Sequence, residues 1–151
     1  MKRLLFIDAC IRGEERSRTA RLASAFLTHV DKDYQIEHLR LTDCGCTPLT
    51  RADLELRAYF ERVSVCGVTF HYTAAGQEGL CKAEKAVYIS TLGGCADTPH
   101  LGESYVKALF QMFGIQEFQS FRAAGLDIVG ADVEAILRGA EEKARQLAAA
   151  F

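Results

Sequence analysis

The stretch Cys10-Ile11-Arg12-Gly13-Glu14-Glu15-Arg16-Ser17-Arg18-Thr19 follows the apolar run Leu4-Leu5-Phe6-Ile7 and precedes an amphipathic segment that starts near Ser17. This order predicts a strand, a tight polar turn and the start of a helix. A helix N-terminus presents unpaired N–H groups and the positive end of the helix dipole, so it attracts anions such as phosphate. The turn also carries hydroxyl and guanidinium groups that favour an anion: Ser17, Thr19, Arg12, Arg16 and Arg18. The sequence therefore predicts an anion site at this turn.

The composition predicts one globular domain over residues 1–151. The chain has 151 residues, of which 49% are hydrophobic, which is typical of a domain with a real core. Its net charge of −2 gives no reason to expect a nucleic-acid or membrane partner. The short N-terminal apolar run is interrupted by Asp8, and no run reaches the ~18 residues that span a bilayer, so we expect a cytoplasmic protein. One residue separates Cys44 from Cys46, which is not zinc-knuckle spacing, so we expect free thiols and no metal.

Strands and helices alternate along the chain. The predicted strands cover residues 2–9, 34–41, 85–91 and 117–122, and the predicted helices cover 17–30, 51–65, 102–113 and 131–150. This alternation is typical of the doubly wound α/β class, in which a parallel sheet has helices on both faces. Ligands bind such sheets beyond the carboxyl ends of the strands. The turns at 10–19 and 91–95 both follow strands, so we expect them at this edge.

The first turn also permits a different chemistry. Cys10, followed after five residues by Arg16 and Ser17, matches the Cys-x5-Arg-Ser/Thr loop of tyrosine phosphatases, in which a thiolate attacks phosphorus. Against this, Glu14 and Glu15 would place negative charge inside a loop that must surround a dianion, and the chain has no Asp-Pro pair to supply a general acid. A Cys10-dependent phosphatase of the low-molecular-weight type is one alternative, and an ordinary polar turn with a buried Cys10 is another.

A second block resembles a known family. It comprises Gly-Val-Thr-Phe-His-Tyr-Thr at 67–73, Gly-Gln-Glu-Gly-Leu at 76–80 and Lys-Ala-Val-Tyr-Ile-Ser-Thr-Leu-Gly-Gly at 85–94. With the phosphate turn before it and Phe113-Gly114-Ile115 after it, the block is similar to the FMN-dependent NAD(P)H oxidoreductases, the flavodoxin-like azoreductases and quinone reductases. The resemblance implies a flavodoxin-like fold, FMN as cofactor and NADH or NADPH as electron donor. It also implies a quinone or azo-type aromatic acceptor, reduced in a ping-pong cycle, and a homodimer.

The resemblance also implies the site residues. Cys10, Ser17, Arg18 and Thr19 correspond to the FMN phosphate side, and Arg12 is added for its charge. Thr91, Leu92, Gly93 and Gly94 correspond to the turn that meets the flavin ring, where glycines let the backbone approach closely. Phe70 and Tyr72 lie in a hairpin that the family places near the flavin pocket and the dimer contact, which implies contact with an aromatic substrate; in a monomer they would belong to the core. No catalytic side chain is expected, because the flavin carries the electrons. His71 and His100 are assigned no role, because lone histidines are more often surface or structural than catalytic.

One unit of the family pattern is missing. Leu54-Glu55-Leu56-Arg57 runs directly into Ala58-Tyr59-Phe60, where the family has a third strand and a loop against the flavin ring. In the strand order 2-1-3-4-5 the third strand is central, and each buried backbone group that it leaves unpaired costs about 1–3 kcal/mol. The flanking strands could pair directly, the sheet could be rearranged, or the sequence as given could omit a segment, which is the interpretation we favour. A non-catalytic flavodoxin-like remnant is therefore a third functional alternative.

Overall fold

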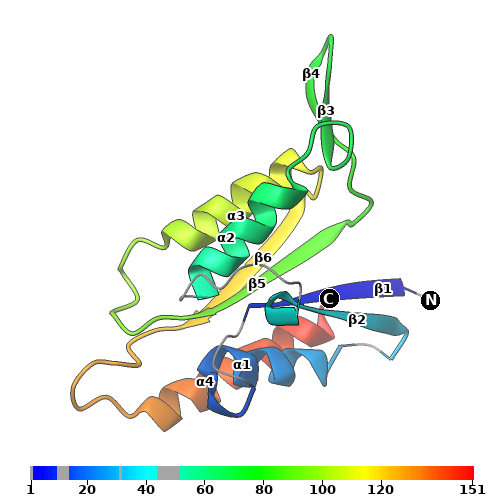
Figure 1. Cartoon of the computed structure of the whole chain (residues 1–151). Helices are drawn as coiled ribbons and strands as arrows, with labels where there is room; N and C mark the ends of the chain where they lie inside the picture. Colours follow the sequence, from blue (N-terminus) through cyan, green and yellow to red (C-terminus); the bar gives the residue numbers. More distant parts are fainter. Residues whose placement is uncertain (1, 10–13, 31, 44–51) are drawn as a thin grey trace.

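The computed structural model describes residues 2–9, 14–30, 32–43 and 52–151 (Figure 1). The alternating elements are β1 (Lys2–Asp8), α1 (Arg18–Leu27), β2 (Tyr34–Arg40), α2 (Ala52–Val63), β5 (Lys85–Thr91), α3 (Leu101–Met112), β6 (Glu117–Ala123) and α4 (Val133–Ala149). The structure also contains two short 3-10 helices, η1 (Glu14–Arg16) and η2 (Leu41–Asp43). A hairpin is formed by β3 (Phe70–Thr73) and β4 (Gly76–Gly79). The predicted α/β class is confirmed.

The parallel strands form two separate pairs. β1 pairs with β2 from Lys2 opposite Tyr34 to Asp8 opposite Arg40, and β5 pairs with β6 from Lys85 opposite Glu117 to Thr91 opposite Ala123. Within the described residues no ladder joins β1 to β5, so these strands do not close directly over the missing unit. Helix α2 is continuous across the junction at 54–58. The parallel sheet is therefore interrupted at the position where the central strand is lacking.

Helices cover both faces of the β5–β6 pair, as a doubly wound fold requires (Figure 1). Side chains of a strand alternate between its faces. Ile89 and Phe121 accordingly pack toward α1 and α4, whereas Tyr88 and Phe118 pack toward a cluster on the α2 and α3 side. The buried members of that second cluster are Phe60, Val106 and Phe113. Among the helices that the structure describes, none combines the length and apolar character needed to cross a membrane.

Helix α1 packs along α4 and joins the two halves of the chain. Leu22 and Phe26 lie one turn apart on α1 and are 0% and 3% exposed. They contact the buried face of α4, whose members recur at helical spacing and are Leu137, Ala140, Ala144 and Ala148. Because three of these four residues are alanines, the helix axes can approach closely. The amphipathic pattern that predicted α1 thus forms a helix–helix contact.

Charged side chains extend this contact at the surface. The Arg21 guanidinium donates to both carboxylate oxygens of Glu134, at 3.0 and 2.7 Å, and also to Glu141. The hydrogen bonds to Glu134 and Glu141 raise the pKa of Arg21 above its usual range, and the same contact lowers the pKa of Glu134. Arg21 therefore stays charged and ties α1 to the first half of α4.

The β1–β2 pair is packed less completely. Leu4 and Tyr34 reach the cluster around Phe26, and the Tyr34 ring lies 5.8 Å from that of Phe151. A hollow of about 770 Å³ lies between these strands and α1 and is bounded by Phe6, Asp8, Ile36 and His38 on the strand side. This face of the β1–β2 pair is therefore incompletely covered by α1.

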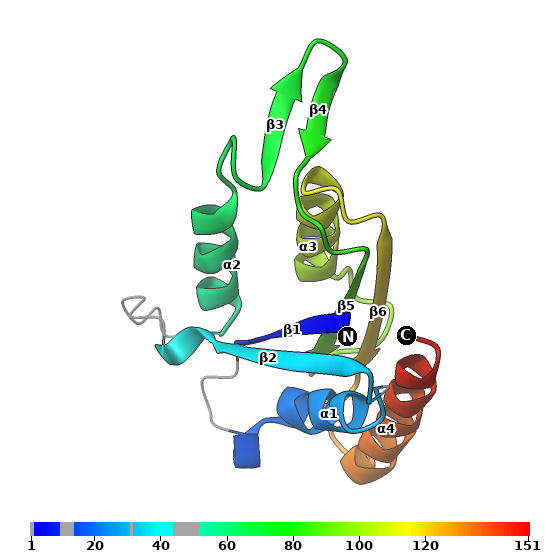
Figure 2. The ribbon, with the colours of Figure 1, turned by 90° about the vertical axis from the view of Figure 1, so that its right-hand side faces the viewer.

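The β3–β4 hairpin projects beyond the rest of the chain (Figure 2). His71 and Glu78 face each other across it with 3.0 Å between Nε2 and Oε2. Phe70 packs partly against the cluster of Phe60 and Val106, but Tyr72 is 71% exposed. The prediction that both aromatics would be core residues in a monomer is therefore wrong for Tyr72, because a two-stranded hairpin has no second layer to cover it.

The α1–α4 contact predicts a large effect of Leu22→Ala. The substitution removes a fully buried side chain and should lower the free energy of unfolding by about 2–5 kcal/mol. Chemical denaturation followed by circular dichroism measures this change. Leu101→Ala is the matched control, because Leu101 is 79% exposed and its loss should change stability by less than about 0.5 kcal/mol. Equal effects of the two variants would contradict the packing described here.

Candidate functional site

The start of α1 is a helix N-terminus capped by a serine. Ser17 is the N-cap, and its Oγ accepts a hydrogen bond of 3.1 Å from the N–H of Ala20. An α-helix leaves its first N–H groups without intrahelical acceptors. Those of Arg18 and Thr19 therefore point out from the helix end, where the dipole is positive. This geometry matches the predicted phosphate turn.

The second turn, residues 91–94, follows β5 and is fixed by the segment after β6. The N–H of Leu92 donates to the carbonyl of Ala123 at 2.8 Å. In return, three successive N–H groups donate to carbonyls of the turn: Gly125 to Gly94 at 2.7 Å, Leu126 to Leu92 at 3.2 Å and Asp127 to Gly93 at 3.1 Å. A Cβ at Gly93 would overlap the Asp127 carboxylate, so this position accommodates only glycine unless Asp127 moves.

Two side-chain contacts connect the turns. The hydroxyls of Thr19 and Thr91 are hydrogen-bonded at 2.8 Å. The Arg18 guanidinium donates to Oδ1 of Asp127 at 2.9 Å and to the carbonyl of Leu126 at 3.4 Å. The prediction that both turns lie at one edge is confirmed. Within the described residues the structure thus brings together Ser17, Arg18, Thr19, Thr91, Leu92, Gly93 and Gly94.

Sequence reasoning missed Asp127. The only local signal is its place after Gly125, whose φ of +82° marks a turn that glycine favours. Asp127 lies 109 positions from Arg18, so its contact depends on how the segment after β6 folds back over β5. No local pattern in the sequence carries that information.

The other predicted site residues lie elsewhere. Cys10 and Arg12 fall outside the described residues. Phe70 and Tyr72 precede β5 and lie beyond its amino end, whereas the 91–94 turn lies at its carboxyl end (Figure 1). Within one chain, the structure therefore does not bring these two aromatics to the predicted flavin site.

The histidines and cysteines have local roles in the described part of the chain. His100 is the N-cap of α3: its Nδ1 accepts a 3.0 Å hydrogen bond from the N–H of Glu103, which is a structural role. Cys66, Cys81 and Cys95 are free thiols. A hydrogen bond with the Thr98 hydroxyl lowers the pKa of Cys95, which is exposed beside the glycine turn.

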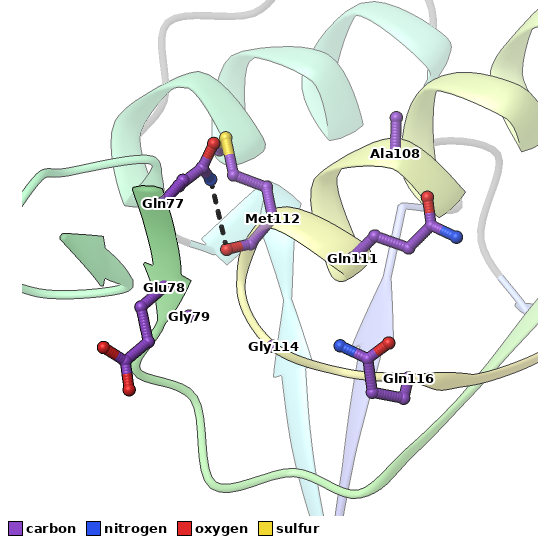
Figure 3. Close-up of a pocket in the computed structure, with 8 residues that line it drawn as sticks. All are labelled: Gln77, Glu78, Gly79, Ala108, Gln111, Met112, Gly114 and Gln116. Carbon is purple, nitrogen blue, oxygen red and sulfur yellow. Dashed lines mark hydrogen bonds between the residues drawn. The ribbon is translucent and has the colours of Figure 1, made fainter. Parts of the chain in front are cut away.

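A pocket of about 590 Å³ lies away from this edge, where the hairpin meets the end of α3 (Figure 3). The Gln77 amide donates to the carbonyl of Met112 at 3.4 Å, and Gln111 and Gln116 line the same pocket. Gly79 lies so close to Gly114 that a Cβ there would overlap backbone atoms. The pocket belongs to the base of the hairpin and is separate from the two turns.

Comparison with known proteins gives the family. The flavodoxin-like fold family matches residues 54–148, so the chain belongs to this family. An FMN-dependent NADH:quinone oxidoreductase of Lachnoclostridium phytofermentans is 42% identical over 98 residues, which cover 64% of this chain and 50% of that protein. The chain spans about half the length of this relative and of several others that it matches. The crystal structure of azoreductase from Bacillus anthracis str. Sterne superimposes with a TM-score of 0.81 at 18% identity and full coverage of both chains, which shows the shared fold.

A full-length alignment gives the number of aligned positions that this chain lacks. An FMN-dependent NADH:quinone oxidoreductase of Clostridium perfringens aligns with the whole of this chain and the whole of its own, at 28% identity over 198 residues. Since this chain has 151 residues, about 47 aligned positions have no counterpart here, somewhat more than a βα unit of roughly 30 residues. The family match begins at residue 54, where the sequence analysis places the gap.

The residues at this edge fit the phosphate and one side of the ring of FMN. A serine hydroxyl, helix N–H groups and an arginine are donors suited to a phosphate monoester. Gly94 presents backbone without a side chain, as close approach to a planar ring requires, whereas the Cβ side of Gly93 is occupied by the Asp127 carboxylate. The family segment that would flank the ring from the missing unit has no counterpart in this sequence.

The hydrogen bond between Thr19 and Thr91 can be tested with valine, which keeps the side-chain shape. Thr19→Val or Thr91→Val should each cost about 1 kcal/mol, because the partner hydroxyl loses its hydrogen bond. The double variant should cost less than the sum, with a coupling of about 0.5–1.5 kcal/mol in a double-mutant cycle of urea denaturation. Additive losses would mean that the two hydroxyls do not interact in solution.

Proposed function

We propose that this chain binds FMN and acts as an FMN-dependent NAD(P)H oxidoreductase with a quinone or azo-type aromatic acceptor. The observation that carries the proposal is the Thr19–Thr91 hydrogen bond of 2.8 Å, which holds the anion-binding helix start beside the glycine turn. The names of the relatives support the same reading and favour NADH over NADPH as donor. A cytoplasmic location fits this donor and the free thiols.

The side chains serve binding and orientation in this proposal. FMN, when bound, supplies the hydride acceptor and passes the electrons on. Ser17 and the N-terminus of α1 hold the phosphate, with Arg18, Thr19, Cys10 and Arg12 assigned to the same side. The turn formed by Thr91, Leu92, Gly93 and Gly94 meets the ring edge, and the N–H groups of Gly93 and Gly94 stabilise negative charge that develops there. No side chain of this chain is assigned to bond breaking.

The phosphate assignment is tested at Ser17. Asp and Asn cap helices about as well as Ser, so Ser17→Asp and Ser17→Asn should both keep α1 intact. Asp adds a negative charge where the phosphate binds, so Ser17→Asp should weaken FMN binding at least tenfold, while Ser17→Asn changes it much less. Quenching of flavin fluorescence gives both affinities, and riboflavin, which lacks the phosphate, should bind both variants alike.

Activity is measured as NADH oxidation in the presence of FMN and a quinone. Turnover that requires added FMN supports the proposal. Equal FMN affinities of Ser17→Asp and Ser17→Asn would remove the phosphate assignment. The interrupted sheet favours one second candidate, a folded remnant that does not bind flavin, and a wild-type chain that leaves FMN fluorescence unchanged would establish it. The relatives and the structure reported above offer no support for the phosphatase alternative.

A homodimer accounts for the placement of the hairpin. Phe70 and Tyr72 lie at the opposite end of β5 from the 91–94 turn, so they reach a flavin edge only if it belongs to a second copy. The hairpin and the residues just before it expose apolar surface, including Val68 at 66% and Tyr72 at 71% exposure. Such side chains favour burial in an interface. In this arrangement the aromatic acceptor lies between the flavin of one copy and the hairpin of the other.

The dimer proposal is tested by Tyr72→Glu. The charge should convert a dimer into a monomer in sedimentation velocity and lower quinone reduction, while FMN affinity changes less than about twofold. Val129→Glu is the control, because Val129 is the most exposed apolar residue of the described chain and lies outside the hairpin. A wild-type monomer, or a dimer that Tyr72→Glu leaves intact, would contradict the proposal.

A further inference from the structure

A carboxylate holds Arg18 beside the proposed phosphate site. Nη1 of Arg18 lies 2.9 Å from Oδ1 of Asp127, and the same atom donates to the carbonyl of Leu126 at 3.4 Å. The side chains of Arg18 and Asp127 are 43% and 72% exposed. Because water reaches both groups, Arg18 can exchange this partner for another anion without opening the core.

The two partners differ in how firmly they are held. The backbone of Asp127 is fixed to the glycine turn by its 3.1 Å hydrogen bond to Gly93 and by that of Gly125 to Gly94. Its carboxylate fills the space where a Cβ at Gly93 would lie. Arg18, in contrast, is the first residue of α1, and long side chains on a helix point back toward the N-terminus. The guanidinium can therefore turn from Asp127 toward the anion site at the helix start.

A phosphate monoester is the stronger partner for this guanidinium. It carries about −1.5 to −2 charges at pH 7 and three acceptor oxygens, whereas Asp127 offers one charge through a single 2.9 Å contact. At the helix start the ligand would also receive the N–H groups and the dipole. The remaining negative charge of Asp127 would then lie near the bound phosphate and oppose it.

We propose that Asp127 is the resident counter-ion of Arg18, that a phosphate monoester displaces it, and that Asp127 thereby sets how strongly the site prefers a phosphorylated flavin over an unphosphorylated one. The inference rests on the proposed function, because that function places the phosphate beside Arg18. Asp127 is a specificity determinant in this account and takes no part in electron transfer.

The test compares FMN with riboflavin in wild type, Asp127→Asn and Asp132→Asn. Exposed ion pairs contribute about 0.2–1 kcal/mol, so removing the competing carboxylate should tighten FMN binding by a factor of about 1.4 to 5. Riboflavin affinity should stay unchanged. Asp132→Asn removes the same charge five positions away and keeps the cap of α4, where Oδ1 of Asp132 accepts from the N–H of Ala135 at 2.9 Å; it should alter neither affinity. The gain from Asp127→Asn should disappear in an Arg18→Gln background.

If Asp127→Asn weakens the binding of FMN and of riboflavin equally, the inference is overturned. The Arg18–Asp127 pair would then serve only to position the two turns. Equal effects of Asp127→Asn and Asp132→Asn would also overturn it. A second arm measures the rise in melting temperature with inorganic phosphate. If wild type binds no flavin, the proposed function fails. The role of Asp127 is then still supported if inorganic phosphate raises the melting temperature of Asp127→Asn more than that of wild type or Asp132→Asn. No difference among the three proteins in that arm would end the inference as well.

Discussion

Leu22 and Phe26 of α1 pack against the alanine-rich face of α4, and the rest of the structure depends on this contact. In a continuous parallel sheet, a central strand would join the N-terminal and C-terminal strands through its backbone. The described strands form two parallel pairs without such a ladder, so side-chain packing must supply the connection. The contact is non-directional and apolar, and the bidentate pair of Arg21 with Glu134 adds geometric specificity.

The candidate site depends on the same helix. One end of α1 is buried against α4, and the other begins at Ser17 beside the glycine turn. The Thr19–Thr91 and Arg18–Asp127 contacts therefore lie on a helix whose position is already fixed by its core face. This explains how the two turns stay together at one edge although no described strand lies between β1 and β5. A substitution that loosens the packing of α1 against α4 should therefore also disturb the contacts between the two turns.

Most of the fold could be predicted because each element carries its own periodic pattern. The strand at 85–91 and the helix at 131–150 are local signals, and the common edge of the two turns follows from both turns succeeding strands. The predicted helix at 17–30 ends earlier, at Leu27, since helix ends are set by capping more than by apolar spacing. The contact of Arg18 with Asp127 and the exposure of Tyr72 depend on distant parts of the chain, so no local pattern predicts them.

The β1–β2 pair carries a physical cost that the helices do not remove. Leu5 of β1 and Ile36 of β2 are 54% and 44% exposed, and the hollow beside α1 shows that this pair lacks a complete layer. Exposed strand edges with apolar side chains favour pairing with other chains. The aromatic contacts of Tyr34 and Phe26 with Phe151 hold the pair near Tyr34, whereas its other end, at Asp8, leads directly to the phosphate turn. That end is held as well, because the buried Asp8 carboxylate lies 3.5 Å from Nε2 of His38 and 3.5 Å from Nε of Arg40. A bound anion at the start of α1 would therefore extend the support of this pair beyond Asp8.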